Sequence, residues 1–347
     1  MSTLETNSIG KYSGNNVSVD DALNLKSYTT TQRDALTSVA GDSIYNSTTN
    51  KPQYYDGSAW QDMAGAGFDT SFLVIAGGGG GGGNNNAGGG GAGGYRNSYA
   101  SETSGGGNTT EEVFKTLKST NYTVTIGAGG TGVTSAGYGD NGSDTRYGNI
   151  VSVGGGGGAG DLGGAAPQKY SGAVGGSGGG NAYNGTTVTR HQGVTNQGFA
   201  GSTGNGSSPF QGGGGGGAAE AGNTDGQGSG GDGLASSITG SSVTRAGGGS
   251  GATNDSSTIA GGDGGGGNGG YSGNAPTAGT ANTGGGGGGG GVSGTTGGNG
   301  GSGIVILRYA TADATITVGA GLTSSSATDG SDTVVTFTAG TGTVSWA

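Results

Sequence analysis

Residues 72–94 read FLVIAGGGGGGGNNNAGGGGAGG and pose the central question of this sequence. Residues that favour β-strands run directly into seven consecutive glycines, and glycine loses more backbone freedom on folding than any other residue. The glycine tract is therefore either a disordered tether or a structural element that other parts of the chain hold in place.

The composition excludes the common fibrous and globular classes. Glycine supplies 96 of the 347 residues, proline supplies only 4, and the glycines do not follow the Gly-X-Y repeat of collagen. Hydrophobic residues, at 28%, are too few to fill one ordinary core in a chain of this length. Charged residues make up only 10%, whereas most disordered chains are rich in charge. If the chain folds, contacts other than side-chain burial must dominate its stability.

Charge and residue usage also exclude several kinds of partner. The formal net charge is −10 and basic residues are scarce, so the chain lacks the basic stripe that nucleic acids require, and no nucleic acid partner is expected. There are no cysteines to form disulfides or thiolate metal sites. The first residues, MSTLETNSIG, lack the pattern of a signal peptide, and the aliphatic runs are too short for membrane insertion.

Residues 1–67 predict a small N-terminal region with a short helix and a β-meander. The stretch TTQRDALTSVAG favours a helix with Thr31 as its N-cap and Gly41 as its stop. Three strand-like pieces follow at 44–45, 53–55 and 59–60, and the last two flank Asp56-Gly57, a strong hairpin signal. A region of this size is only marginally stable alone, so we expect it to lean on another chain or partner.

Residues 68–309 form a glycine-rich region, and residues 310–347 predict a C-terminal β-hairpin on which Trp346 packs. Strand-like pieces recur next to the glycine runs, at 72–75, 122–126, 149–153 and 303–309. The stretch TTEEVFKTLKS at 109–119 is compatible with a capped helix from Thr109, but it is equally compatible with a hairpin arm before the strand YTVTI.

A glycine run can adopt an extended threefold helix of the polyproline II type, whose N–H and C=O groups all point outward. Side by side, such helices can bond to neighbours in several directions, because no Cβ atom separates their backbones. The longest runs span residues 77–83, 154–158, 212–217, 264–267 and 284–291. We therefore predict a mostly β and irregular fold, in which polyglycine II helices form a bundle with flanking strands; a disordered tether is the alternative.

Two parts of the sequence resemble proteins of tailed bacteriophages. The segment RDALTSVAGDSIYNSTTNKPQYYDGSAW resembles one that is common in tail fibres and related virion proteins. FLVIAGGGGGGG, together with NYTVTIGAGG, NIVSVGGGGG and GGSGIVILRY, is similar to the glycine-rich domain of many phage tail fibres. In some fibre-tip adhesins of T-even-like phages, glycine tracts form a polyglycine II bundle whose distal loops bind the host.

The resemblance implies a tail appendage of the virion, made in the host cytoplasm. Its implied partners are other tail or fibre proteins and a bacterial surface receptor, either a glycan or an outer-membrane protein. Phage fibres are usually trimers, so a homotrimer is expected. A capsid decoration or connector protein with a purely structural role is the alternative.

Catalytic and metal-binding motifs give no support to an enzyme. GxGxxG occurs many times by composition alone, and no copy lies in a strand–turn–helix unit. His191 is the only histidine, and the acidic residues are scattered among predicted turns. The stretch GSGGDGLAS around Asp232 is a single imperfect calcium-repeat motif. In YGDNGSD, the oxygens of Asp140, Asn141 and Asp144 are compatible with a hard-cation site, but turn formation explains the same residues and is favoured. No cofactor, metal site or enzymatic activity is expected.

Candidate receptor-binding residues lie between the glycine runs, where aromatic rings are surrounded by Ser, Asn, Gly and Thr. This composition is typical of recognition loops, although some rings could instead cap the bundle ends. The wider set includes Tyr95, Tyr99, Tyr138 and Tyr147. The longest insert, residues 181–211, is the first candidate for contact with a host. The predicted receptor-binding residues are Tyr170, Tyr183, Arg190, His191, Phe199, Phe210 and Tyr271.

Overall fold

The structure is a computed structural model, and it describes residues 25–63, 67–161, 171–184, 191–271, 273–292 and 295–347. The chain divides into two compact units, Met1–Ala66 and Gly67–Ala347. Within the described ranges, no helix combines the length and apolar character that a membrane span requires.

The first unit contains the predicted meander. Strands β1 (Ser27–Tyr28), β2 (Ser43–Asn46), β3 (Lys51–Tyr55) and β4 (Trp60–Asp62) form one sheet in that order, and the helix α1 (Thr30–Asp34) follows β1.

The turn signal in this unit is confirmed. Asp56 accepts hydrogen bonds from the N–H groups of Ser58 and Ala59, each at 2.8 Å, and thereby closes the β3–β4 turn. These bonds hold the pKa of the Asp56 carboxyl below its usual range. The predicted helix is corrected at both ends. The predicted N-cap, Thr31, is wrong by two residues: Thr29 is the N-cap, because its side chain and that of Gln32 form a reciprocal capping box. The predicted stop, Gly41, is wrong: α1 already ends at Asp34 with Ala35 as its C-cap, and Gly41 lies in a later turn with φ of 98°.

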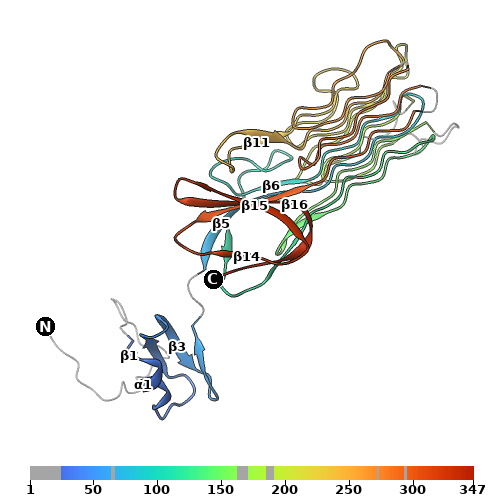
Figure 1. Ribbon diagram of the computed structural model, residues 1–347. Helices are drawn as coiled ribbons and strands as arrows, with labels where there is room; N and C mark the ends of the chain where they lie inside the picture. The colour runs from blue at the N-terminus through green and yellow to red at the C-terminus, as the bar shows by residue number, and fades with distance from the viewer. Residues whose placement is uncertain (1–24, 64–66, 162–170, 185–190, 272, 293–294) are drawn as a thin grey trace, which may run out of the picture. The chain divides into compact units, whose positions relative to one another are not determined.

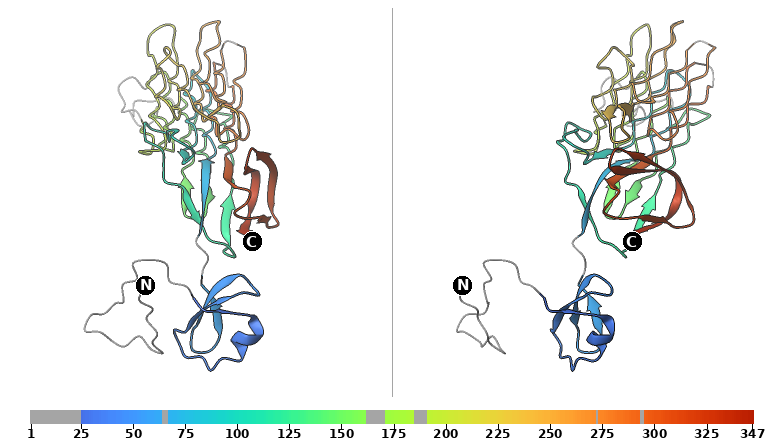
Figure 2. Two further views of the ribbon diagram at one scale, coloured as in Figure 1. Left: turned by 90° about the vertical axis from the view of Figure 1, so that its left-hand side faces the viewer. Right: turned by 60° about the vertical axis from the view of Figure 1, so that its left-hand side comes forward.

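The second unit is built on a ten-stranded sheet that curls into a nearly closed barrel (Figure 2). Its main path runs β10-β9-β8-β16-β13-β5-β6, with β14 and β15 paired to β16 and β7 paired to β5. The strands are β5 (Phe68–Ile75), β6 (Tyr95–Asn97), β7 (Phe114–Thr116), β8 (Tyr122–Thr125), β9 (Thr145–Tyr147), β10 (Ile150–Ser152), β13 (Ile304–Ala310), β14 (Ile316–Val318), β15 (Leu322–Asp329) and β16 (Asp332–Trp346). A separate hairpin joins β11 (Leu234–Ser236) to β12 (Val243–Arg245).

Both faces of the sheet are buried around its centre. On β5, Phe72 and Val74 pack into one cluster, whereas Leu73 and Ile75 pack into another on the opposite face. Trp346, at the end of β16, lies in the first cluster and is 1% exposed. Its ring neighbours come from β5, β8, β9 and β13, so it packs into the core of the sheet rather than on the C-terminal hairpin alone. The C-terminal hairpin belongs to this unit, because β16 pairs with both β13 and β8.

The ambiguous stretch at 109–119 contains a strand, β7, and its partner is β5.

Glycine-rich segments continue the strands as a bundle of extended rods (Figure 1). One rod, residues 77–83, leaves β5, and the next, residues 88–94, returns to β6. Further rods of the bundle are residues 127–133, 137–143, 154–159, 177–182, 198–204, 212–217, 246–252, 284–291 and 297–303.

Hydrogen bonds between the rods recur at every third residue. Gly79 and Gly82 donate to the carbonyl groups of Gly91 and Gly88, at 2.8 and 3.0 Å. Such a period is the one that a threefold helix with outward-pointing polar groups produces. The rods are therefore polyglycine II helices, as predicted, and the glycine tracts are not a tether. The predicted run 264–267 is the exception, because Gly264 and Gly265 form a turn with φ of 92° and 103°.

The rod at 77–83 is surrounded by six neighbours. Its N–H groups donate to three rods, and its carbonyl groups accept from three others. The accepting rods are 88–94, 137–143 and 297–303, and the donating rods are 127–133, 154–159 and 284–291. Each N–H group from 77 to 83 has a main-chain partner, so the polar groups of this buried tract are satisfied.

Glycine is required in this rod because the neighbouring rods leave no room for a side chain. A Cβ atom added to any residue from 77 to 83 would lie less than 3.0 Å from a main-chain carbonyl oxygen of another segment. For Gly80 that oxygen belongs to Thr131. None of these glycines has a positive φ, so any L-residue could adopt the backbone conformation, but no side chain would fit.

The sheet and the bundle share one register. Ile75 lies opposite Tyr95 in the β5–β6 pair. Gly79, four residues after Ile75, donates to Gly91, four residues before Tyr95, so the antiparallel register of the strands continues in the rods. The same holds for four other strand pairs, whose register continues unchanged in the hydrogen bonds between the rods that extend them. These pairs are β5–β13, β8–β9, β9–β10 and β11–β12. The strands therefore align the rods.

Side-chain oxygens replace the missing neighbours at the edge of the bundle. Asn141 and Asp144 accept hydrogen bonds from the N–H groups of Gly157 and Gly154, each at 2.9 Å and three residues apart. Asn299 does the same for Gly132 at 2.9 Å. The turn-forming role expected for Asn141 and Asp144 is therefore replaced by a role in closing the outer rod.

Substituting Gly80 by Ala should lower the free energy of unfolding by about 3 kcal/mol or more, because a methyl group cannot fit against the Thr131 carbonyl. Gly137→Ala is the matched control, since a Cβ atom there would meet nothing closer than 3.5 Å. Chemical denaturation of both variants measures the difference. Equal stability of the two variants would contradict close packing of the rods.

Candidate functional sites

The loops at the end of the bundle farthest from the sheet form a distal tip. At its centre, Asn84, Asn85 and Asn86 join the rods 77–83 and 88–94 in three successive left-handed conformations, with φ of 62°, 46° and 52°. Asparagine tolerates this conformation better than most residues, which explains its use in so tight a reversal. The carbonyl group of Asn86 accepts the N–H of Tyr183 at 3.1 Å, so two loops are joined here.

Three of the predicted residues lie on adjoining loops of this tip. The rings of Tyr183 and Phe210 meet edge to face, with centroids 5.3 Å apart. The Phe210 carbonyl accepts the N–H of Asn254 at 3.1 Å, and the neighbouring Thr253 N–H donates to Gly270, which precedes Tyr271. Tyr183, Phe210 and Tyr271 are all partly exposed.

The other predicted residues are not gathered with them. His191 lies on the flank of the bundle, where its carbonyl group accepts the N–H of Gly201, and burial lowers the pKa of its imidazole. Phe199 lies toward the sheet, where its N–H donates to the Gly217 carbonyl at 3.0 Å. Tyr170 and Arg190 lie outside the described residues.

The insert at 181–211 is not a single loop. Its described part includes the tip residue Tyr183, a turn near the sheet at 194–198 and the rod 198–204, whose Ser202 N–H donates to Gly214. From the wider aromatic set, Tyr95 and Tyr147 are fully buried in β6 and β9 rather than placed in loops. Their rings belong to the core because Tyr147 packs into the first buried cluster and Tyr95 into the second.

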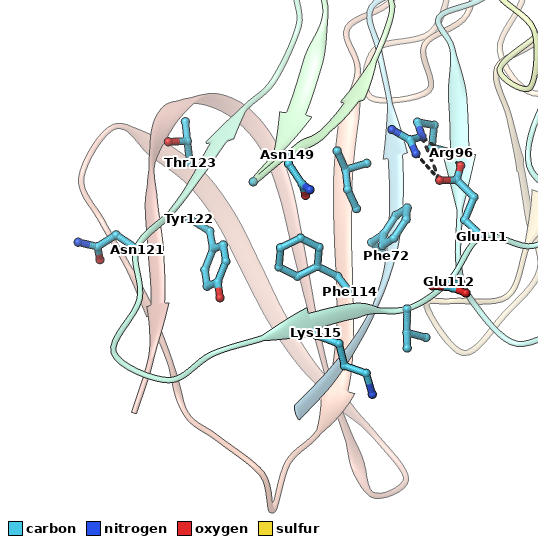
Figure 3. Close-up of a pocket in the computed structure, with 13 residues that line it drawn as sticks. Phe72, Arg96, Glu111, Glu112, Phe114, Lys115, Asn121, Tyr122, Thr123 and Asn149 are labelled. Carbon is cyan, nitrogen blue, oxygen red and sulfur yellow. Dashed lines mark hydrogen bonds and ion pairs between the residues drawn. The ribbon is translucent and has the colours of Figure 1, made fainter. Parts of the chain in front are cut away.

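A cavity of about 750 Å³ opens at the seam where the barrel does not close. Figure 3 shows Phe72, Phe114 and Tyr122 around it, with Arg96 and Glu111 paired at one side. Glu111 also accepts a hydrogen bond from the Ser104 hydroxyl at 3.0 Å. The cavity thus combines aromatic walls with an ion pair, and Glu112 and Lys115 also line it.

Side chains close the rest of the seam in place of a strand ladder. The Ser152 hydroxyl donates to the Val74 carbonyl at 2.7 Å, and the amide oxygen of Gln197 accepts the Val153 N–H at 2.8 Å. Sequence reasoning missed the cavity and the seam because the participating residues come from segments that lie far apart along the chain. No local motif could have indicated them.

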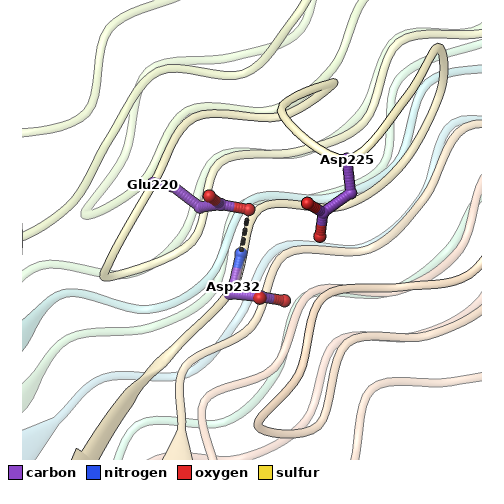
Figure 4. A group of neighbouring side chains, drawn as sticks. All are labelled: Glu220, Asp225 and Asp232. Atoms are coloured by element: carbon purple, nitrogen blue, oxygen red, sulfur yellow. Dashed lines mark hydrogen bonds between the residues drawn. The ribbon is translucent and has the colours of Figure 1, made fainter.

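Three carboxylates meet on the side of the bundle (Figure 4). Glu220, Asp225 and Asp232 each offer an oxygen, and these oxygens lie within 4.8 Å of one another. Oxygen ligands of this kind suit a hard cation, and the structure adds two carboxylates to the Asp232 motif noted in the sequence. Glu220 and Asp232 also serve the fold, since they accept the N–H groups of Asp232 and Asp263 at 3.3 and 2.6 Å.

Comparison with known proteins gives a family for most of the chain. A family model described as a glycine-rich domain matches residues 56–310. The chain belongs to the glycine-rich domain family. No curated protein and no solved structure matches it.

The glycine-rich domain, as the family model bounds it, ends with β13 and leaves out β14, β15 and β16. β16 nevertheless lies between β13 and β8 in the sheet that carries the rods. The domain of this chain is therefore completed by C-terminal strands that the family model does not cover.

Replacing Glu220 by Gln should raise the unfolding temperature at pH 7. Burial, and then the charges of Asp225 and Asp232, raise the pKa of the Glu220 carboxyl above its ordinary value of 4.5. The folded state thus binds this proton more tightly than the unfolded chain, so stability falls as the pH rises through and above 4.5.

The stabilisation by Glu220→Gln should shrink near pH 4, where the wild-type carboxyl is protonated. Glu112→Gln, at an exposed carboxylate outside the cluster, is the control. Calorimetry at both pH values measures the effect. A gain that is independent of pH, or that Glu112→Gln reproduces, would contradict charge repulsion as the cause.

Proposed function

We propose that this chain is a structural virion protein of a tailed bacteriophage, a tail fibre or spike whose glycine-rich domain presents the distal tip to a cell-surface receptor. The proposal is supported by the resemblance of residues 33–60 and of the strand-plus-glycine segments to phage fibre proteins. A single observation carries the receptor-binding part: a rigid bundle holds aromatic loops together at one end.

The physical properties of the tip suit recognition of a surface. Tyr183 and Phe210 supply large apolar area with few rotatable bonds, and the surrounding residues are mainly Asn, Ser, Gly and Thr. Main-chain hydrogen bonds connect neighbouring tip loops, so little conformational entropy is lost on binding. The receptor in this proposal is a glycan or an outer-membrane protein, and the protein acts without a cofactor and without catalysis.

The first unit takes the role of assembly in this proposal. It joins the chain to other tail or fibre proteins, and the chain functions as a homotrimer on the virion. The division into two compact units supports such a separation of roles, because each unit keeps its own sheet.

A second candidate is a capsid decoration or connector, in which the bundle serves as a stiff spacer. The satisfied hydrogen bonds of the rods favour this role equally, since stiffness alone does not require a receptor. Imaging of labelled protein on intact particles separates the two, because a decoration is spread over the capsid and a fibre lies on the tail.

Replacing both Tyr183 and Phe210 by Ser should slow adsorption of the particles to host cells at least tenfold, the effect of losing about 1.4 kcal/mol of binding free energy. Deletion of residues 181–211 is a poorer test, because it also removes the rod 198–204. The adsorption rate constant of virions that carry the variant measures the effect.

Leu117→Ser is the matched control, since Leu117 is an exposed apolar residue, 42% accessible, near the sheet rather than on the tip. Particles with this variant should adsorb like the wild type. Unchanged adsorption of the double tip variant, with normal incorporation into particles, would remove these residues from the receptor-binding site.

A further inference from the structure

The sheet of the first unit has one covered face. Ile44, Asn46 and Gln53 point to the side on which α1 lies, and all three are buried. Arg33, from the helix, donates to the Gln53 side chain at 2.9 Å, and the Asn46 amide donates to the same oxygen at 3.0 Å. This side of the sheet is therefore closed by a polar network.

The opposite face of the sheet has no cover among residues 25–63. Tyr45 lies across from Pro52 on the neighbouring strand, and Ser43 lies across from Tyr54 in the same ladder. Tyr45 and Pro52 are half-buried, and Tyr54 is 40% accessible. Two aromatic rings and a proline thus form a continuous apolar strip on an open sheet.

The unit has little other apolar burial. Ile44 is its one buried hydrophobic side chain among residues 25–63, and α1 contributes no buried residue at all. One buried aliphatic side chain, together with half-buried rings such as the Tyr55–Trp60 pair with centroids 5.5 Å apart, offsets little of the conformational entropy of an ordered four-stranded sheet. Additional burial must come from outside these residues, and the open face is where apolar side chains remain to be covered.

The open face is electrically suited to contact an identical face. Its strand residues are all uncharged, namely Ser27, Ser43, Tyr45, Pro52, Tyr54 and Gln61. The whole chain carries a formal charge of −10, so most surfaces of two copies repel each other. The strand residues of this face, by contrast, bring no charge into contact, and the nearby Asp56 carboxylate, which accepts a hydrogen bond from the Gln61 side chain at 2.9 Å, belongs to the β3–β4 turn.

We infer that the open face of the first unit is the homo-oligomerisation surface of this protein, occupied by the same face of further copies. Tyr45 and Tyr54 are its anchors, since buried tyrosines at interfaces give large contact area at a low entropic cost. Only the number of copies rests on the proposed trimeric fibre. The surface itself follows from burial and charge and does not depend on receptor binding.

Analytical ultracentrifugation of the full chain tests the inference. The wild type should sediment as a closed oligomer at micromolar concentration, expected to be the trimer, and Tyr45→Ser with Tyr54→Ser should weaken association at least a hundredfold. Val39→Ser is the control: Val39 is 65% accessible, but it lies outside the sheet, so this variant should associate like the wild type.

Ser43→Glu provides a second variant that removes no apolar contact. Facing copies would each bring a negative charge to the interface, so the oligomer should dissociate at low salt and recover at 1 M salt, where the screening length is about 3 Å. The inference would be overturned by a wild-type chain that is still monomeric at a concentration 100-fold above the micromolar range. It would also be overturned by an oligomer that persists both in the double Tyr45→Ser, Tyr54→Ser variant and in Ser43→Glu. Adsorption measurements with tip variants remain independent of either result.

Discussion

The absence of a Cβ atom is the constraint on which the second unit depends. The glycine rods lie so close together that a methyl group on one rod would overlap a carbonyl oxygen of the next. That proximity is what allows each rod to bond to several neighbours at once. In an ordinary core, side chains fill the interior and secondary structure satisfies the main chain. Here the glycine rods themselves fill the interior, and the hydrogen bonds between them satisfy their main-chain polar groups.

The sheet solves the problem of alignment. An isolated glycine rod has no side chains to fix its register, because every residue offers its neighbours the same surface. The strands supply that information, since β5, β8, β10 and β12 carry their pairing offsets directly into the rods. Where side chains do appear at the junction, they serve the sheet: Ala92 and Ala246 pack into the same buried cluster as Leu73 and Ile75.

Local features of the fold were predictable from the sequence because their causes are local. The strands beside the glycine runs, the Asp56-Gly57 turn and the polyglycine II rods follow from residue type and spacing. The pairing of β7 with β5, the central place of β16 and the seam cavity depend on contacts between distant segments, which no short pattern encodes. The candidate tip was partly predictable: Tyr183 and Phe210 are in contact there and Tyr271 follows an adjoining loop, whereas Phe199 lies near the sheet because its segment turns back along the bundle.

Hydrogen–deuterium exchange of individual main-chain amides tests the central claim most directly. If the rods are mutually bonded, the N–H groups of residues 77–83 should exchange slowly and become exposed only with global unfolding of the second unit. Amides at the exposed turn 224–227 should exchange much faster and serve as the internal reference. Exchange of the rod amides at the rate of an unfolded chain, while β5 and β13 stay protected, would contradict the account.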